Sequence, residues 1–166
     1  MQARSESNAA ELLDRVVTEQ LPGRRGLDAW RALLAAHATL LRRLETDLYQ
    51  ETRLALADFD VLAQLAVAGG ELRMTELAGR ALISRSGMTR RVGRLVDEGL
   101  VRRASTDADA RGVVVRLTDA GLARLLETAP VHARGIADLF VARLQDEELA
   151  ALEAVLAKVI VECNFG

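Results

Sequence analysis

The feature that most constrains the fold of this chain is a pair of short helical segments with a tight turn between them. The first segment spans about residues 74–80 and the second about 85–98, with only 81–83 separating their ends. Ser84 stands directly before the second segment, where a serine hydroxyl can accept a backbone N–H at a helix start. Gly99 follows and ends that helix. Two short helices joined in this way predict a helix-turn-helix.

The residues after Gly99 change from helical to strand-like composition. Segment 100–104 has strand-like composition, and segment 113–117 begins with three β-branched valines, which favours strands. The polar segment 105–112 lies between them and predicts the tip of a β-hairpin. A hairpin directly after the second helix of a helix-turn-helix is a wing, so the predicted lobe is a winged helix-turn-helix.

The predicted helix 85–98 has two contrasting faces when its residues are spaced at 100°. One face is apolar and predicted to be buried: Met88, Val92, Leu95 and Val96. The opposite face and one flank carry small, hydroxyl or cationic residues: Arg85, Ser86, Thr89, Arg90, Gly93 and Arg94. No acidic residue occurs in this helix before Asp97. Such a face suits the major groove of DNA, because arginine can read guanine and hydroxyls can bind bases or phosphates.

The charge of the chain is unevenly distributed along its length. The whole chain has a formal net charge of −2. Residues 71–117 have a net charge of +4, whereas residues 1–70 have −2 and residues 118–166 have −4. A local cationic segment is the expected footprint of a DNA-binding protein, since phosphates are neutralised locally.

These patterns select candidate residues for contacts with duplex DNA. The recognition helix and its cap contribute Ser84, Arg85, Ser86, Thr89, Arg90 and Arg94. Arg102 and Arg103 at the base of the hairpin are predicted to reach flanking phosphates. At the hairpin tip, Arg111 can enter the minor groove, where the negative potential is strongest, and Asp109 can orient it.

The remaining helices are predicted from apolar residues at helical spacing. Their expected ranges are 9–20, 27–54, 57–68, 119–144 and a last helix capped by Asp146, with Thr118 as the cap of the fourth and a kink at Pro130. The fold class is therefore mainly α with a small β-hairpin wing. Length and composition fit one globular domain over residues 1–166.

Several segments together resemble the MarR family in order and spacing. They are LRMTELA at 72–78, SRSGMTR at 84–90, DEGLV at 97–101, DARG at 109–112 and LTDAG at 117–121. The resemblance covers about residues 30–159. Two positions depart from it, since Ala57 and Arg73 stand where the family often has a helix-capping hydroxyl.

The resemblance implies a bacterial transcription regulator, expected to be a repressor. It implies a homodimer built by helices 27–54 and 119–164, with the winged helix-turn-helix lobe at 57–117 reading a pseudo-palindromic operator. It further implies a small aromatic or anionic effector, for which Trp30 and Asp60 are candidate lining residues; anchoring the dimer core is the favoured interpretation of Trp30.

Other site chemistry is not expected from the sequence, which predicts no cofactor. His37 and His132 lack partners at metal-ligand spacing, so no metal site is predicted. Cys163 is the only cysteine, which excludes an intrachain disulfide and fits a reducing cytoplasm, and no apolar run is long enough for a membrane span.

Two alternatives from other classes stay open at this point. A small helical enzyme would need a cluster of convergent polar residues, and the sequence offers none. A winged-helix module that binds protein rather than DNA would need an apolar or acidic face on the 85–98 helix, whereas this face is basic.

Overall fold

A computed structural model describes residues 2–21, 23–81, 84–106 and 109–163. For residues 2–8, 10, 105–106, 109–112 and 162–163 it describes the backbone alone. The chain forms two compact units, Met1–Arg42 and Arg43–Gly166. Helix α2 continues from the first unit into the second.

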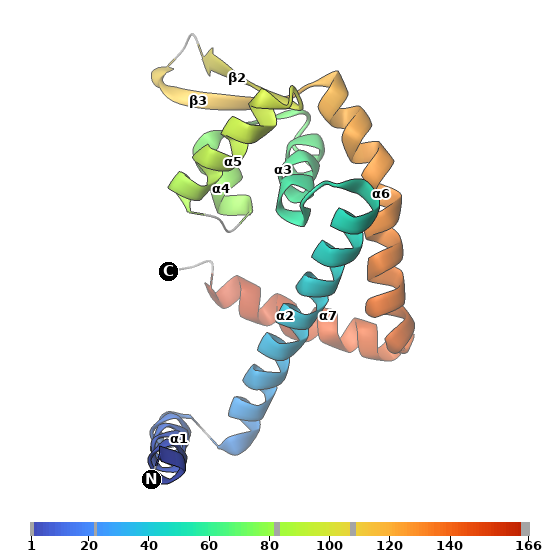
Figure 1. The fold of residues 1–166 in the computed structure, drawn as a ribbon. Coiled ribbons are helices and arrows are strands. Elements are labelled where there is room, and N and C mark those ends of the chain that lie inside the picture. Colours follow the sequence, from blue (N-terminus) through green and yellow to red (C-terminus); the bar gives the residue numbers. More distant parts are fainter. Residues whose placement is uncertain (1, 22, 82–83, 107–108, 164–166) are drawn as a thin grey trace. The chain divides into compact units, whose positions relative to one another are not determined.

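The described elements are mostly helices, with one small sheet, as the sequence predicts (Figure 1). In chain order they are α1 (Gln2–Gln20), α2 (Arg24–Thr52), α3 (Leu56–Val67), β1 (Glu71–Arg73), α4 (Met74–Arg80), α5 (Arg85–Asp97), β2 (Val101–Thr106), β3 (Asp109–Leu117), α6 (Asp119–Leu139), the 3-10 helix η1 (Val141–Arg143) and α7 (Asp146–Cys163).

In the first unit, α1 is tied to α2 by an ion pair. Arg31 Nη2 donates a hydrogen bond to Asp14 Oδ1 at 2.8 Å, and this bond holds the pKa of the Asp14 carboxyl below its ordinary value. Leu27 is buried in this unit. The first helix begins at Gln2, earlier than the predicted residue 9, because its apolar stripe starts later than its helical backbone.

The second unit has a continuous apolar core formed by helices and the sheet. Helical spacing brings Val61, Leu62 and Leu65 of α3 to its centre, and all three are fully buried. The other fully buried core residues come from the neighbouring elements: Leu48, Leu77, Met88, Val92, Leu95, Val101 and Val115. This core supports α5 from beneath and leaves its opposite face outward.

The sheet has a strand that the sequence did not reveal. Its antiparallel order is β1-β3-β2, and the β1 residue Leu72 pairs with Val115 of β3. β1 has only three residues, too few for an alternating pattern to identify it. Because β1 leads directly into α4, the base of the wing is hydrogen-bonded to the entrance of the helix-turn-helix.

The wing contains a β-bulge near its outer end. Ser105 pairs with Val113, but the next residue of β2, Thr106, pairs with Asp109. Residues 110–112 of β3 therefore lie between two paired positions without a partner of their own in this register. The sequence predicts segment 105–112 as the hairpin tip, and the structure extends the paired strands into it as far as Thr106 and from Asp109.

Two helices lack a capping hydroxyl, and in each an acidic side chain accepts a hydrogen bond from a backbone N–H at the helix start. At the start of α3, the Leu56 backbone N–H donates to Glu45 Oε2 of α2 at 2.9 Å. At the start of α4, the Arg73 backbone N–H donates to Glu76 Oε2 at 3.2 Å. Both bonds satisfy backbone donors that a helix start otherwise leaves unpaired.

Thr118 caps α6 as predicted and fastens the helix to the end of α5. Its Oγ1 accepts the Gly121 N–H at 3.0 Å and lies 2.8 Å from the carbonyl oxygen of Gly99. Gly99 ends α5 with a positive φ of 72°, a conformation that favours glycine. A Cβ on Gly121 would lie 2.0 Å from the backbone oxygen of Leu100, so only glycine fits this approach.

The C-terminal helices differ from prediction at one junction. The expected single helix 119–144 ends at Leu139, because Phe140 leaves helical geometry, and η1 follows. The cap of α7 is Gln145 rather than Asp146, since the Gln145 carbonyl accepts the Leu149 N–H and its own N–H donates to Glu148. Pro130 lies inside α6, whose axis changes direction along its length in Figure 1.

Candidate nucleic-acid interface

Helix α5 begins with the predicted serine cap. The Gly87 backbone N–H donates to Ser84 Oγ at 3.2 Å, and the hydroxyl oxygens of Ser84 and Ser86 lie 3.4 Å apart. The cap fixes the first turn of α5 and leaves both hydroxyls at the surface. This end of the helix therefore offers exposed hydroxyl groups at the positive end of the helix dipole.

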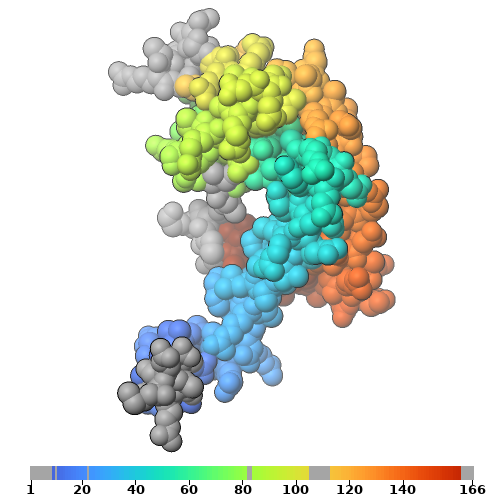
Figure 2. All heavy atoms as spheres, in the orientation of Figure 1, coloured from blue at the N-terminus to red at the C-terminus, as the bar shows by residue number. Residues whose placement is uncertain are grey.

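The orientation of α5 agrees with the predicted faces. Met88, Val92 and Leu95 are fully buried. The residues proposed for DNA contact on this helix are all exposed: Arg85, Ser86, Thr89, Arg90 and Arg94. Figure 2 shows α5 in yellow-green at the surface of its unit. The structure thus brings three arginines and two hydroxyl residues to one accessible helix surface.

An acidic residue that the sequence analysis did not single out lies beside α5. Asp58 in the first turn of α3 forms an ion pair with Arg91, with 2.6 Å between Oδ1 and Nη1. The two side chains are 13% and 22% exposed. Arg94 Nη2 lies 3.6 Å from the same oxygen, but its side chain is 57% exposed. Arg91 therefore secures the helix, whereas Arg94 keeps most of its surface open.

Arg103 lies against the other flank of α5. Its Nη2 donates to the backbone oxygen of Thr89 at 3.4 Å. The Thr89 hydroxyl donates to the Arg85 carbonyl at 2.9 Å, so its hydrogen is engaged within the helix. The wing thereby adds a cation to the surface that α5 presents.

Arg102 lies in a different environment from Arg103. It pairs across the sheet with Arg116, and Arg116 Nε is 2.5 Å from Glu71 Oε2. Cross-strand partners share a face of the sheet. The two adjacent arginines, predicted together at the hairpin base, thus occupy opposite faces of β2.

The two candidate residues of the wing tip belong to strand β3. Asp109 is paired with Thr106, and Arg111 lies within the bulged segment 110–112. The side chains of Asp109 and Arg111 lie outside what the structure describes. Their proposed contacts therefore stay predictions.

The two candidate ligand residues lie on different elements and in different units. Trp30 on α2 is 55% exposed. Asp60 on α3 is partly buried, and its charge acts on His132 of α6. His132 packs against Phe59, with 4.6 Å between ring centroids, and burial lowers the pKa of its imidazole, an effect that Asp60 partly offsets.

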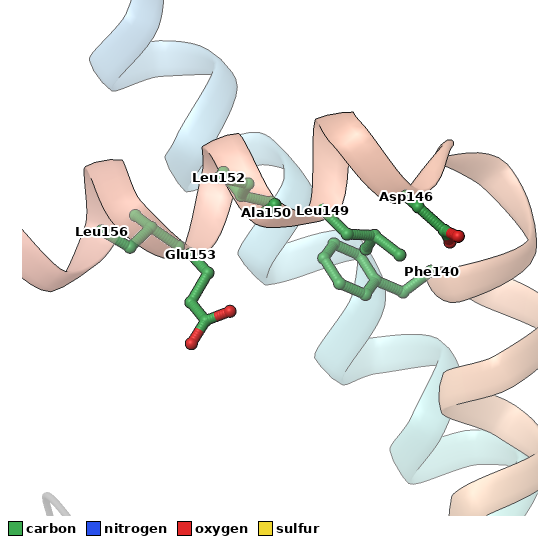
Figure 3. Close-up of a pocket in the computed structure, with 7 residues that line it drawn as sticks. All are labelled: Phe140, Asp146, Leu149, Ala150, Leu152, Glu153 and Leu156. Carbon is green, nitrogen blue, oxygen red and sulfur yellow. The ribbon is translucent and has the colours of Figure 1, made fainter.

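A groove of about 560 Å³ lies along α7 (Figure 3). Its lining is mainly apolar, with two carboxylates: Phe140, Asp146, Leu149, Ala150, Leu152, Glu153 and Leu156. Neither Trp30 nor Asp60 lines this groove.

Among the described residues, no group of three or more His, Cys, Asp or Glu side chains could hold a metal ion. None of the helices within the described ranges has the length and apolar character that a membrane span requires.

Comparison with known proteins identifies the family. The model of the MarR family matches residues 54–112. Sco3205, a MarR family transcriptional regulator from Streptomyces coelicolor solved in complex with DNA, is 33% identical, with 80% of this chain and 83% of that chain covered and a TM-score of 0.75. The chain belongs to the MarR family.

Two further transcriptional regulators are also similar over most of the chain. AbsC from Streptomyces coelicolor is 28% identical, covers 89% of this chain and 99% of its own, and has a TM-score of 0.80. The HTH-type transcriptional regulator PecS from Dickeya dadantii is 27% identical over 128 residues, which is 76% of each chain. The protein is thus a DNA-binding transcription regulator with a winged helix-turn-helix, and membership of this non-enzymatic family agrees with the expectation that it is not an enzyme.

Proposed function

We propose that this MarR-family protein is a homodimeric repressor that binds a pseudo-palindromic operator through α5. The observation that carries the proposal is the exposed cationic and hydroxyl surface of α5, held over a buried apolar face. An α-helix fits the major groove, where arginine can bind guanine bidentately. The structure of Sco3205 in complex with DNA supports DNA binding by this chain.

We infer that the residues of this surface divide into two kinds. Ser86, Thr89, Arg90 and Arg94 are exposed on α5 and are proposed to meet base edges or phosphates in the major groove, with the Thr89 hydroxyl oxygen as an acceptor for a base donor. Ser84, Arg85, Arg102 and Arg103 are proposed to bind the phosphate backbone, and Arg111, oriented by Asp109, the minor groove.

The homodimer is supported by apolar side chains that the single chain leaves exposed. On α2 they are Trp30, Leu33, Leu34 and Leu41, and on α7 they are Val155, Val159, Ile160 and Val161. Exposed apolar surface costs about 25 cal/mol per Å² relative to burial, so a second copy that covered these helices would be strongly stabilised. We therefore assign residues 27–54 and 119–164 to dimerisation and 57–117 to DNA binding.

We also propose that a small aromatic or anionic ligand modulates DNA binding. A ligand that favours a lobe spacing unlike that of successive major grooves would weaken operator binding. A panel of phenolic and purine-derived anions, tested by thermal shift and DNA affinity, checks this part. It fails if no compound changes either quantity.

The main experiment is genome-wide mapping of bound DNA fragments followed by affinity measurements on the enriched site. We expect one or more inverted repeats near promoters, bound by a dimer whose mass light scattering confirms. Transcription from such a promoter should rise when the protein is absent. Failure of the folded protein to prefer any DNA sequence would overturn the proposed function, and a stable monomer at micromolar concentration would overturn the dimer.

A further inference from the structure

Arg102 and Arg103 are neighbours in β2 but leave the strand on opposite faces. Successive side chains of a strand alternate between faces, and cross-strand partners share one. Arg103 pairs with Val115, which is fully buried, so it leaves β2 on the face that packs on the helices. β2 is an edge strand, which lets the long side chain pass from this face to the surface beside α5.

The Arg103 guanidinium lies against α5 at Gly93, where the helix has no side chain. In an α-helix the carbonyl of residue 89 points toward the N–H of residue 93. Residue 93 is glycine, so no side chain covers that carbonyl oxygen, and Arg103 Nη2 donates to it at 3.4 Å. A Cβ built on Gly93 would lie 3.6 Å from Arg103 Nη2, in ordinary contact.

Glycine is an unfavourable residue within a helix, which makes its presence here informative. Alanine would fit beside the guanidinium at this distance, but a longer side chain would occupy the space that Arg103 uses. Arg103 comes from the wing, yet the contact is with the backbone of α5. The Arg103 guanidinium therefore lies at the surface of α5, although its backbone is in the wing.

We propose that Arg103 binds a DNA phosphate as part of the α5 surface, and that Gly93 is the positioning residue that leaves room for it. The proposal rests on the proposed DNA-binding function. The guanidinium lies at the flank of α5 nearest the wing, where the edge of an occupied major groove brings phosphates close. One donor holds the guanidinium to the Thr89 carbonyl, and its side chain is exposed, so less side-chain freedom is lost on binding a phosphate.

The test compares salt dependence on two duplexes, the enriched genomic site and an unrelated sequence. Fluorescence anisotropy gives Kd across a series of KCl concentrations. Arg103→Gln should weaken binding to both duplexes by the same factor and reduce the slope of log K against log salt by about 1 per protomer, as loss of one phosphate contact requires. Arg103→Lys keeps the charge and should keep the slope.

Variants at Gly93 test the positioning role. Gly93→Gln should reproduce the loss of slope, and the double variant with Arg103→Gln should show no further loss, because both changes remove the same contact. Arg102→Gln, by contrast, should add to the effect of Gly93→Gln. Gly79→Gln is the control for a long side chain in an exposed helix position, because no atom lies within 4 Å of the Cβ that Gly79 lacks.

Separate outcomes decide the inference and the function. If the wild type binds but Arg103→Gln keeps the full slope, the inference is overturned and the function stands. Additive effects of Gly93→Gln and Arg103→Gln would overturn the role of Gly93. If the wild type binds neither duplex, the function and the inference fall together. Circular dichroism checks folding, and Arg103→Gln decides the phosphate contact even if Gly93→Gln does not fold.

Discussion

Asp58 of α3 and Arg91 of α5 form an ion pair whose Oδ1–Nη1 distance is 2.6 Å, across 33 residues of sequence. Both side chains are mostly buried, and within the described residues Arg91 Nε has no hydrogen-bond partner of its own. Asp58 is therefore the acid that compensates the partly buried charge of Arg91. This pair fixes the flank of the recognition helix that faces α3, while Arg103 contacts the opposite flank.

Asp58→Asn should destabilise the fold, because it leaves the Arg91 charge partly buried without an acid. Breaking a fully buried pair costs about 3–5 kcal/mol, and the remaining exposure of Arg91 reduces the expected loss to about 1–3 kcal/mol. Urea unfolding measures the change. Glu71→Gln is the control, since it breaks the exposed pair with Arg116 and should cost less than about 1 kcal/mol. Equal losses for both variants would contradict the anchoring role of Asp58.

Arg90→Ala should remove much of the DNA affinity and leave the fold intact. Arg90 is exposed on α5, and loss of a bidentate base contact costs about 1–3 kcal/mol per half-site. Anisotropy on the enriched site, together with the melting temperature, measures both effects. Arg143→Ala, which removes an exposed cation from η1, is the control and should bind normally. Wild-type affinity in Arg90→Ala would show that this face of α5 does not enter the groove.

Arg111→Ala should weaken operator binding more than Asp109→Ala, and neither should lower the melting temperature. An arginine in a narrow minor groove gains strongly from the negative potential there. Asp109 is proposed only to orient it, and its removal also takes away a charge that repels phosphate. Loss of a surface side chain should change the free energy of unfolding by less than about 0.5 kcal/mol. A collapse of stability in Arg111→Ala would mean that the residue is structural.

Gly121→Ala should destabilise the second unit by about 3 kcal/mol or more, because the added methyl group overlaps the Leu100 carbonyl. Backbone atoms cannot rotate away as a side-chain end can. Thermal unfolding checks the loss, and Gly79→Ala serves as the control. Gly79 lies in α4 with no atom within 4 Å of an added Cβ, so alanine there should stabilise by about 0.5–1 kcal/mol. Similar melting temperatures for both variants would refute the close approach.

His132 should make the fold less stable in acid. Burial lowers the pKa of its imidazole in the folded protein below the ordinary value of 6.5, so protons bind the unfolded chain more readily. The contribution is fully present above pH 6.5 and is lost as the pH falls from there through the lowered pKa. Urea unfolding at several pH values, compared between wild type and His132→Gln, measures it. The same pH dependence in both proteins below 6.5 would assign the effect to other groups.

Local signals in the sequence were sufficient to predict the helix-turn-helix and the base of the wing. The hydroxyl caps Ser84 and Thr118 were predicted and are confirmed, because each bonds to an N–H three residues along. The buried face of α5 followed from the spacing of Met88, Val92 and Leu95. These features depend on neighbouring residues, which a pattern can show.

Features that depend on distant partners could not be predicted in this way. An acid in the first turn of a helix, such as Asp58, is explained by the helix dipole alone. The sequence therefore gives no sign that Asp58 pairs with Arg91. β1 exists because β3 offers it a partner edge. The separation of Arg102 from Arg103 follows from the sheet register, and only the tertiary structure shows which face packs on α5.

The bulge in the wing separates two parts of the hairpin whose lengths can change independently in evolution. Residues 101–105 and 113–117 pair in one continuous register, and a shift of even one residue there would exchange the buried and exposed faces. Residues 110–112 already lie outside that register, so an insertion or deletion beyond Ser105 leaves the inner pairing unchanged. The outer part of the wing can therefore lengthen or shorten through evolution while the pairing of the part that packs on the helices is kept.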